Sequence, residues 1–232
     1  MFEFAYKEQN PLTWPIAKVF KQDHRSKVWQ TSPIDGKEYV IKLFTFNPIR
    51  QTLLAMIGLH PAQQEIRAHK RLQQLNIPVE KILHHGTSQN QWYLITQAQQ
   101  SCIYNWIRNQ SNLNNFQQRH AIARQLGNLV GQLLQNGHYF KDMKQSNVII
   151  DSQQKLKLID AGSVKRIPKW SQKKYAIRML TLLHQTSEHA AAHGFNPHPI
   201  ELTKTDQWRV VKSLLQLMPE LKPDLLASLR SL

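Results

Sequence analysis

The stretch "YFKDMKQSNVIIDSQQKLKLIDAG", residues Tyr139 to Gly162, joins two polar turns through short apolar runs. The first turn holds Asp142, Lys144 and Asn147 in a D-x-K-x-x-N spacing, and the second places Asp160 before Ala-Gly. The runs "NVIID" and "LKLID" between them predict a small hairpin. An isolated Asp or Asn in a turn is usually a backbone cap. The joined pattern, preceded by a predicted long helix, is much more specific than its parts.

These residue types suit phosphoryl transfer, which depends on positioning, on neutralised charge and on a base directed at the acceptor hydroxyl. Asp142 can accept the hydrogen bond of that hydroxyl, and Lys144 can approach the transferring phosphate. The side-chain oxygens of Asn147 and Asp160 are ligands that Mg²⁺ prefers. The stretch therefore predicts a site that holds a metal–nucleotide and presents a hydroxyl to it.

The same residues carry a resemblance to a known superfamily. "KDMKQSN" resembles the catalytic loop of protein-kinase-like enzymes, and "DAG" is similar to their metal-binding D-F-G motif. The resemblance implies that Asp142 is the catalytic base and that Asn147 and Asp160 bind the metal. It also implies ATP and Mg²⁺ as cofactors.

The first half of the chain offers the remaining partners of such a site. "YVIK" resembles the third-strand V-A-I-K motif, which implies that Lys42 contacts the α- and β-phosphates of ATP. Glu65 lies on the following predicted helix, on the same stripe as Ala68 and Leu72. We expect it to form an ion pair with Lys42. The alternatives are an edge-strand lysine and a solvated helix glutamate.

Several motifs depart from the protein-kinase pattern. No G-x-G-x-x-G precedes the strand, and "QDHRSKVW" takes its place, so phosphate cover is expected from Ser26 and nearby backbone N–H groups. Phe140-Lys141 replaces the usual His-Arg, Ala161 replaces Phe, and no A-P-E follows. These departures favour a kinase for a small substrate or a glycan. They leave open a protein or other small-molecule kinase, and a non-catalytic nucleotide-binding adaptor.

A closer resemblance is to the lipopolysaccharide-core kinases of the Kdo/WaaP family. "HPAQQEIRAHKRLQQLNIPVEKILHHG" is similar to that family's glutamate-bearing helix and the turn after it, and the likeness extends from Lys18 to Arg166. It implies ATP-dependent phosphorylation of a Kdo or heptose hydroxyl on the lipid-linked inner core. The implied place is cytoplasmic, peripheral on the cytoplasmic face of the inner membrane.

The net charge of +15 favours a polyanionic partner, although a solubilising surface charge is the simpler alternative. No acid occurs from Ala161 to Ser187, where basic residues accumulate: Lys165, Arg166, Lys169, Lys173, Lys174 and Arg178. We assign the first five of these to the acceptor or anion patch, with an anionic membrane surface as a further partner. Trp170 and Tyr175 could stack on nucleic-acid bases, but we expect them to pack within the domain and expect no nucleic-acid partner.

The overall pattern predicts an α+β protein with two lobes. Residues 1–97 read as strands around one helix and form the N-lobe, which grips the nucleotide phosphates. Residues 98–232 read as mostly helical and form the C-lobe, with the catalytic loop, metal site and acceptor site. The amphipathic segments "DQWRVVKSLLQLM" and "PDLLASLRSL" near the end are expected to pack in the core rather than on a membrane.

Other features narrow the function less. His189 and His193 share a helical face and form a conceivable zinc pair, but no H-E-x-x-H motif or cysteine set accompanies them, so surface or capping roles are favoured. The single cysteine, Cys102, fits a reducing compartment and rules out an internal disulfide. The pattern predicts neither a secretory signal nor a spanning helix.

Overall fold

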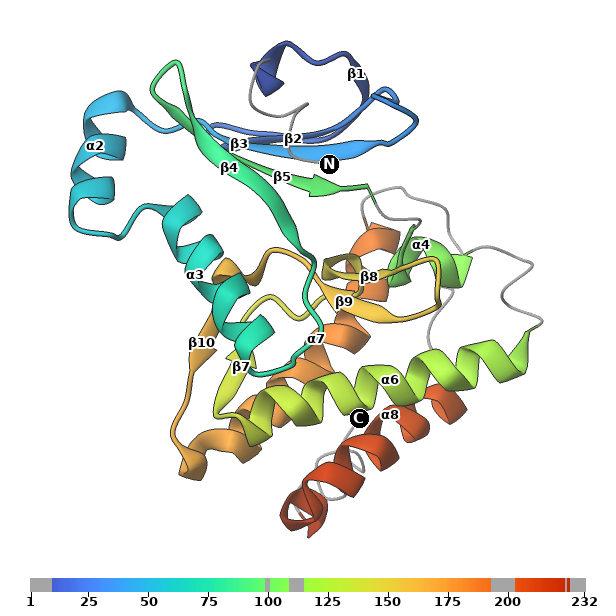
Figure 1. Cartoon of the computed structure of the whole chain (residues 1–232). Coiled ribbons are helices and arrows are strands. Elements are labelled where there is room, and N and C mark those ends of the chain that lie inside the picture. Colours follow the sequence, from blue (N-terminus) through green and yellow to red (C-terminus); the bar gives the residue numbers. More distant parts are fainter. Residues whose placement is uncertain (1–9, 99–100, 109–114, 193–202, 224, 226–232) are drawn as a thin grey trace. The chain divides into compact units, whose positions relative to one another are not determined.

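The computed structural model describes residues 10–98, 101–108, 115–192, 203–223 and 225. It confirms the predicted α+β class, with a strand-rich N-terminal sheet and a helical C-terminal part (Figure 1). The chain divides into two compact units. Unit 1 comprises Met1–Arg71 and Glu80–Ala98, and unit 2 comprises Leu72–Val79 and Gln99–Leu232.

Unit 1 is built on an antiparallel five-stranded sheet of order β1-β2-β3-β5-β4. Its strands are β1 (Ile16–Gln22), β2 (Ser26–Thr31), β3 (Tyr39–Phe44), β4 (Ile82–Ser88) and β5 (Gln91–Gln97). Strand β3 lies in the centre, where Lys42 is opposite Val28 on one side and Leu94 on the other. Side chains alternate between the two faces of a strand, so the register sends Lys42 and Ile41 to opposite faces.

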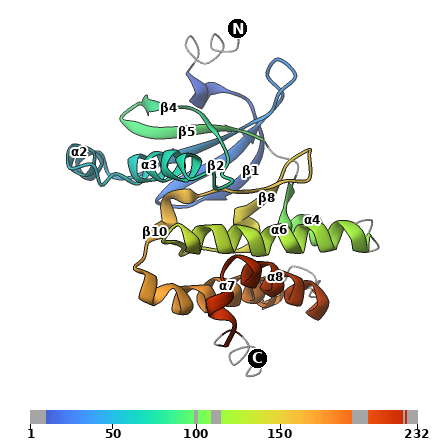
Figure 2. The same ribbon diagram turned by 60° about the horizontal axis from the view of Figure 1, so that its bottom comes forward.

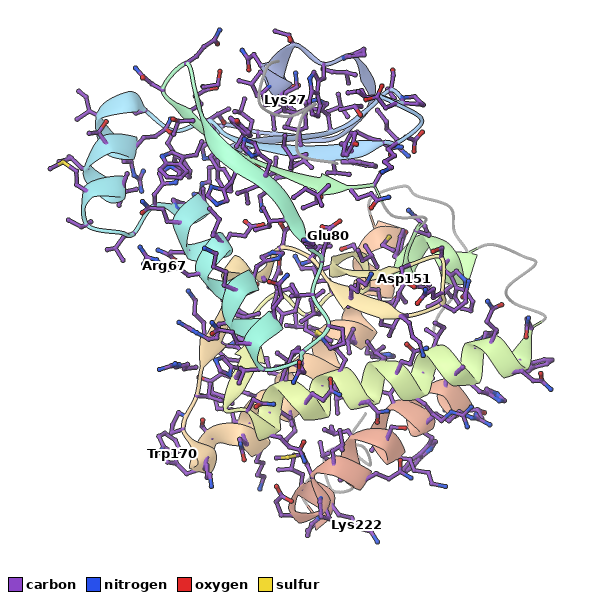
Figure 3. All side chains as sticks on the ribbon, viewed as in Figure 1. Lys27, Arg67, Glu80, Asp151, Trp170 and Lys222 are labelled. Atoms are coloured by element: carbon purple, nitrogen blue, oxygen red, sulfur yellow. The ribbon has the colours of Figure 1, made fainter. Side chains whose placement is uncertain are left out.

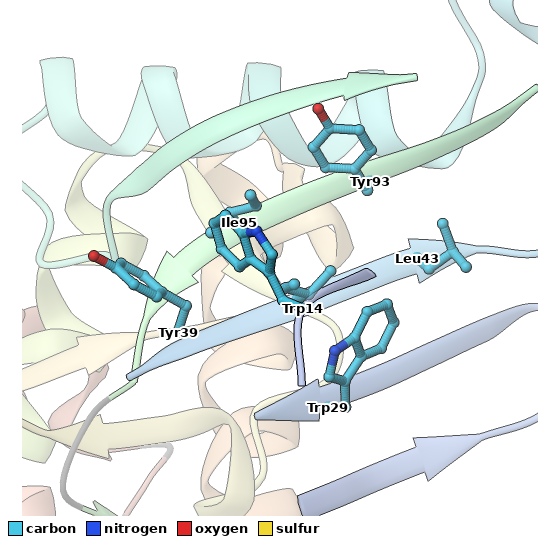
Figure 4. Packing of buried hydrophobic residues seen from close by; sticks show 7 residues of the cluster. Trp14, Trp29, Tyr39, Leu43, Tyr93 and Ile95 are labelled. Carbon is cyan, nitrogen blue, oxygen red and sulfur yellow. The ribbon is translucent and has the colours of Figure 1, made fainter. Parts of the chain in front are cut away.

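One face of this sheet carries an aromatic core (Figure 4). Its buried members are Trp14, Trp29, Tyr39, Ile41, Leu43, Tyr93 and Ile95. Trp14 follows the short helix η1 (Pro11–Thr13) and its ring lies 5.6 Å from that of Tyr39. The odd-numbered residues of β3 all point into this core, which leaves the other face for Lys42.

Two helices follow β3, whereas the sequence predicted only one. The expected helix is α3 (Pro61–Gln74), and the missed one is α2 (Pro48–Met56). Asn47 caps α2 by accepting a hydrogen bond from the Ile49 N–H, with Pro48 at the first position. These are ordinary start signals of a helix.

Helix α3 begins at a buried histidine. His60 Nδ1 accepts a hydrogen bond from the Ala62 N–H at 3.2 Å, which satisfies one donor of the first turn. Its ring stacks on Trp92 at 5.3 Å. Burial lowers the pKa of the His60 imidazole, so the neutral form is favoured at this capping position.

Unit 2 combines helices with two small sheets. The helices are α4 (Ile103–Arg108), α6 (Phe116–Gln135), α7 (Gln172–Ala192), α8 (Lys204–Leu217) and η5 (Pro219–Leu221). The strands are β6 (Ser101–Cys102), β7 (His138–Phe140), β8 (Val148–Ile150), β9 (Leu156–Leu158) and β10 (Val164–Arg166). β6, β8 and β9 form one sheet, β10 pairs with β7, and the predicted β8–β9 hairpin is confirmed.

Helices α7 and α8 both pack on α6 (Figure 2). Gly127 and Gly131 of α6 face α8, and a Cβ at Gly127 would clash with the Val210 carbonyl oxygen. A buried ion pair joins Arg119 to Asp206 at 2.6 Å, and Asp206 also completes a capping box with Thr203. This confirms that "DQWRVVKSLLQLM" packs in the core, while most of "PDLLASLRSL" lies outside the described residues.

Candidate active site

The first polar turn begins where strand β7 ends. Asp142 and Lys144 are half-exposed, and Lys144 Nζ lies 2.9 Å from Asp142 Oδ1. Between them, the Met143 side chain is fully buried. The buried Met143 side chain therefore fixes the turn, while the charged groups of Asp142 and Lys144 on either side of it stay at the surface of unit 2.

Asn147 ends the short helix η2 (Gln145–Asn147) that follows. Its Nδ2 donates hydrogen bonds to the Asp142 carbonyl at 2.9 Å and to Asp142 Oδ2 at 3.2 Å. Because the amide nitrogen is used in this way, Oδ1 is the atom of the amide that is left to accept or coordinate. The predicted base and the first predicted metal ligand thus orient one another directly.

Two buried residues that were not among the predicted site residues hold this turn in place. Gln145 is buried, and its Nε2 donates a hydrogen bond of 2.8 Å to the Leu183 carbonyl of α7. Phe140, also fully buried, replaces the histidine expected before the base, and its N–H points to the Met179 sulfur at 3.3 Å. Neither long-range contact has a signal in the local sequence.

The second predicted metal ligand, Asp160, begins the turn that contains Ala161 and Gly162. Its backbone is left-handed, with φ of 55° and ψ of 38°, which Asp and Asn tolerate better than most residues. A short helix, η3 (Ala161–Ser163), follows, and Ala161 is buried. The sharp reversal directs the chain from β9 into β10.

Backbone hydrogen bonds tie the two polar turns together. Ile159 N–H donates to the Asn147 carbonyl at 3.0 Å, and Lys141 N–H donates to the Ser163 carbonyl at 3.2 Å. Beyond them, Phe140 is opposite Val164 in the β7–β10 pair. Both carboxylate-bearing turns are therefore fixed at their flanks within unit 2.

In unit 1, the predicted ion pair between strand and helix is present. Lys42 Nζ lies 2.8 Å from Glu65 Oε2. Glu65 is buried on the same stripe as Ala68 and Leu72, as the helical periodicity predicted. A buried carboxylate next to the lysine holds its ammonium in one place, although contact with nucleotide phosphates stays a prediction.

Two backbone amides of the turn that replaces the glycine-rich loop are bonded to a carboxylate of the same turn. Asp23 Oδ1 accepts hydrogen bonds from the N–H groups of Arg25 and Ser26, both at 2.8 Å. Together with Lys21, these bonds hold the pKa of Asp23 well below its usual value. The N–H groups of Arg25 and Ser26 are thus bonded to a carboxylate, and Ser26 itself is buried. Phosphate cover by Ser26 and nearby backbone N–H groups stays a prediction.

The basic residues after Gly162 lie on the surface of unit 2. Strand β10, the short helix η4 (Lys169–Ser171) and the start of α7 expose Lys165, Arg166, Lys169, Lys173, Lys174 and Arg178. We call these six the basic surface. Tyr175 packs as predicted, stacked on Tyr139 at 4.0 Å. Trp170 does not: 86% of it is exposed, so the packing expected for it is wrong (Figure 3).

The ligand chemistry of the second unit fits magnesium. Asn147 and Asp160 offer an amide and a carboxylate oxygen, and Mg²⁺ in nucleotide sites takes one or two such protein ligands with phosphates and water. Within the described residues, no three or more His, Cys, Asp or Glu side chains are grouped to hold a metal ion. His193 and the side chain of His189 lie outside them.

The sequence matches the protein kinase domain family over residues 25–222, most of the chain. The chain therefore belongs to the protein kinase domain family. Members of this family are in general ATP-dependent phosphotransferases that act on an alcohol group and use Mg²⁺. No curated protein matches the sequence. In the described part of the chain, no helix combines the length and the hydropathy needed to cross a bilayer.

Proposed function

We propose that this protein is an ATP-dependent kinase that phosphorylates a sugar hydroxyl, Kdo or heptose, on the lipopolysaccharide inner core. The observation that carries the catalytic part is the Asp142–Lys144–Asn147 arrangement, tied by backbone bonds to the Asp160 turn. The basic surface supports a polyanionic acceptor, because phosphorylated core glycans carry the opposite charge. The resemblance to the Kdo/WaaP family supports the sugar.

In the proposed reaction, Asp142 accepts the proton of the acceptor hydroxyl as its oxygen bonds to the γ-phosphorus of ATP. The bond from that phosphorus to the β–γ bridging oxygen breaks, and ADP leaves with the electron pair. Asn147 donates to Asp142 Oδ2 and Lys144 lies at Oδ1, so both carboxylate oxygens have fixed directions.

The charged groups of the reaction have separate roles. Lys144 stabilises charge on the transferring phosphoryl group, and Lys42, held by Glu65, binds the α- and β-phosphates. Mg²⁺, when bound, neutralises phosphate charge, and Asn147 Oδ1 and the Asp160 carboxylate would hold it.

The test is phosphate transfer from γ-labelled ATP to purified lipopolysaccharide core, with total cell protein as a parallel acceptor. We expect label on the core glycan and not on protein. The same result should appear in cells, where mass spectrometry of lipopolysaccharide should show one phosphate missing when the gene is deleted. Label on protein alone, with an unchanged core, would contradict the sugar acceptor.

A second candidate is a non-catalytic nucleotide-binding protein of the same fold. It is favoured by the β1–β2 turn, where the Arg25 and Ser26 amides are bonded to Asp23. It predicts Mg²⁺-dependent thermal stabilisation by ATP with no γ-phosphate transferred to any acceptor. Turnover of labelled ATP that stops in Asp142→Ala would reject it.

A further inference from the structure

Helix α2, which the proposed function does not use, has an exposed apolar stripe. Ile49 is 73% exposed, Leu53 59%, Met56 79% and Ile57 66%. Their spacing of four, three and one residues places them on one side of the nine-residue helix and the turn after it. We call these four residues the α2 stripe. Leu59, next along the chain, is also 51% exposed.

The opposite side of α2 carries a polar residue. Gln51 is only 3% exposed, and its Nε2 donates a hydrogen bond of 2.7 Å to the Phe46 carbonyl. A surface helix of a soluble protein normally buries its apolar side, whereas α2 buries Gln51 and exposes the four residues of the stripe. Figures 1 and 2 show α2 at the outer edge of unit 1, beside the start of α3. The stripe therefore faces outward, as the surface for a partner would.

The charge around the stripe has one sign. No acidic residue occurs from Tyr39 to Gln64. Arg50 lies on α2 itself, with its guanidinium 5.9 Å from the centre of the Phe46 ring. Arg67 of α3 lies against the turn after α2, where its Nη2 is 2.6 Å from the position that a Cβ on Gly58 would take. An aliphatic stripe that is bordered by arginines and has no acidic neighbour in the sequence complements a surface that is both apolar and negatively charged.

We propose that the α2 stripe inserts into the headgroup–acyl boundary of an anionic phospholipid bilayer, with Arg50 and Arg67 at the headgroups. A spanning helix needs about 20 apolar residues, so a helix of this length lies in the interface. A second copy of this chain is a poorer match, because apposing two such surfaces brings arginine against arginine. Binding to the bilayer does not depend on the identity of the acceptor. If the acceptor is lipid-linked, this binding would bring the enzyme close to it.

The test is cosedimentation of the full chain with vesicles of phosphatidylcholine plus phosphatidylglycerol, and of phosphatidylcholine alone. We expect binding to the anionic vesicles and about a tenfold or larger loss in the double variant Leu53→Gln/Met56→Gln. The matched control is Phe116→Gln/Trp208→Gln, which removes two exposed apolar residues from unit 2 and should bind like the wild type. Equal binding by all three proteins, or equal loss in both variants, would overturn the proposal.

A second measurement locates the contact. A polarity-sensitive dye at Met56→Cys, in a Cys102→Ser background, should shift to shorter wavelength on anionic vesicles and be quenched by a lipid-soluble quencher. The same dye at Trp208→Cys should not respond. A dye at position 56 that responds to protein concentration in the absence of vesicles would show instead that α2 joins two copies, and would contradict the proposal.

Both experiments are done without ATP or an acceptor. A lack of kinase activity on lipopolysaccharide would therefore contradict the proposed function but not the bilayer contact. A lack of vesicle binding would contradict the bilayer contact but not the proposed function.

Discussion

At the scale of single residues, each unit contains one charged arrangement that the chemistry of phosphoryl transfer would require. Lys42 and Glu65 form an ion pair in unit 1, while Asp142, Lys144 and Asn147 share hydrogen bonds in unit 2. A substitution that removes one charge from such a group changes the free energy of unfolding as well as ligand binding. Measuring both quantities in single variants therefore separates the structural role of a residue from its functional role.

Asp160 can be tested by a substitution that keeps its backbone. Asn tolerates the left-handed conformation observed at this position, so we expect Asp160→Asn to unfold at nearly the wild-type temperature. It should lose most of the thermal stabilisation by ATP with Mg²⁺, because the charged ligand is gone. Asp160→Ala should in addition lower the free energy of unfolding by about 1 kcal/mol. Unchanged Mg²⁺-dependent stabilisation in Asp160→Asn would refute the ligand assignment.

Lys42 is predicted to support folding as well as nucleotide binding. Lys42→Met removes the ammonium that lies 2.8 Å from the buried Glu65 carboxylate, so urea unfolding should show a loss of about 2–3 kcal/mol in the free energy of unfolding. Lys18→Met, at an exposed position of β1, is the matched control and should change the free energy of unfolding by less than about 0.5 kcal/mol. Equal losses in both variants would mean that the ion pair contributes nothing specific.

At the scale of elements, close packing between α6 and α8 depends on glycine. Gly127→Ala would bring a methyl group against the Val210 backbone, whereas Gly131→Ala would meet only the Leu217 side chain, at 2.8 Å. Backbone cannot move aside as a side chain can.

We expect thermal unfolding to show Gly127→Ala less stable by about 2 kcal/mol or more, despite the better helix propensity of alanine, and Gly131→Ala within about 1 kcal/mol of the wild type. The reverse order would show that the observed α6–α8 packing is incorrect.

The turn of the β8–β9 hairpin contains Asp151, whose carboxyl group is expected to make the stability of the fold depend on pH. Burial raises the pKa of Asp151, but hydrogen bonds from Lys157 and from the backbone N–H groups of Lys155 and Gln153 outweigh it, so the pKa lies below the ordinary 3.8. A carboxyl whose pKa is depressed on folding stabilises the fold above its unfolded pKa. That contribution disappears as the pH falls through the folded value.

Asp151→Asn should therefore be less stable than the wild type by about 1 kcal/mol at pH 7. The difference should shrink in urea titrations as the pH falls below the ordinary pKa of 3.8. Glu220→Gln, at an exposed carboxylate, should show no comparable trend. A constant difference for Asp151→Asn across this range would contradict the assignment of the stabilisation to the carboxylate.

Much of the fold was predictable because two local periods decide which face a side chain takes. The alternation in "YVIK" separated Lys42 from the aromatic core, and the 3.6-residue period put Glu65 on the inward stripe of its helix. Helix α2 was missed although Asn47-Pro48 is a start signal, because the α2 stripe faces outward and the polar Gln51 is buried. Periodicity alone assumes the opposite arrangement.

The site was predictable in composition but not in its supports. The spacing indicated Asp142, Asn147 and Asp160, since these residue types suit a base and an oxygen-ligated metal. The bonds that fix them, such as Lys141 to Ser163 and Gln145 to Leu183, join positions far apart in the chain. The exposure of individual side chains could not be predicted either. Tyr175 packs on Tyr139 and Trp170 is exposed, although both lie among the same lysines.

At the scale of the whole molecule, the chain combines a protein kinase domain with a net charge of +15. Much of this charge is exposed on unit 2 beyond the Asp160 turn, as the basic surface. Such an excess speeds encounter with polyanionic acceptors and makes it sensitive to salt. The proposed acceptor depends on the basic surface, and the proposed bilayer contact depends on Arg50 and Arg67 of unit 1. The phosphoryl transfer itself depends on Asp142.

The most direct test of the central claim is the rate of γ-phosphate transfer by Asp142→Asn, measured beside its affinity for ATP with Mg²⁺. Asparagine keeps the shape of the side chain and removes the base. We expect transfer to lipopolysaccharide core to fall by about 10²-fold or more, while nucleotide affinity changes by less than about threefold. Transfer at the wild-type rate by the folded variant would show that Asp142 is not the base.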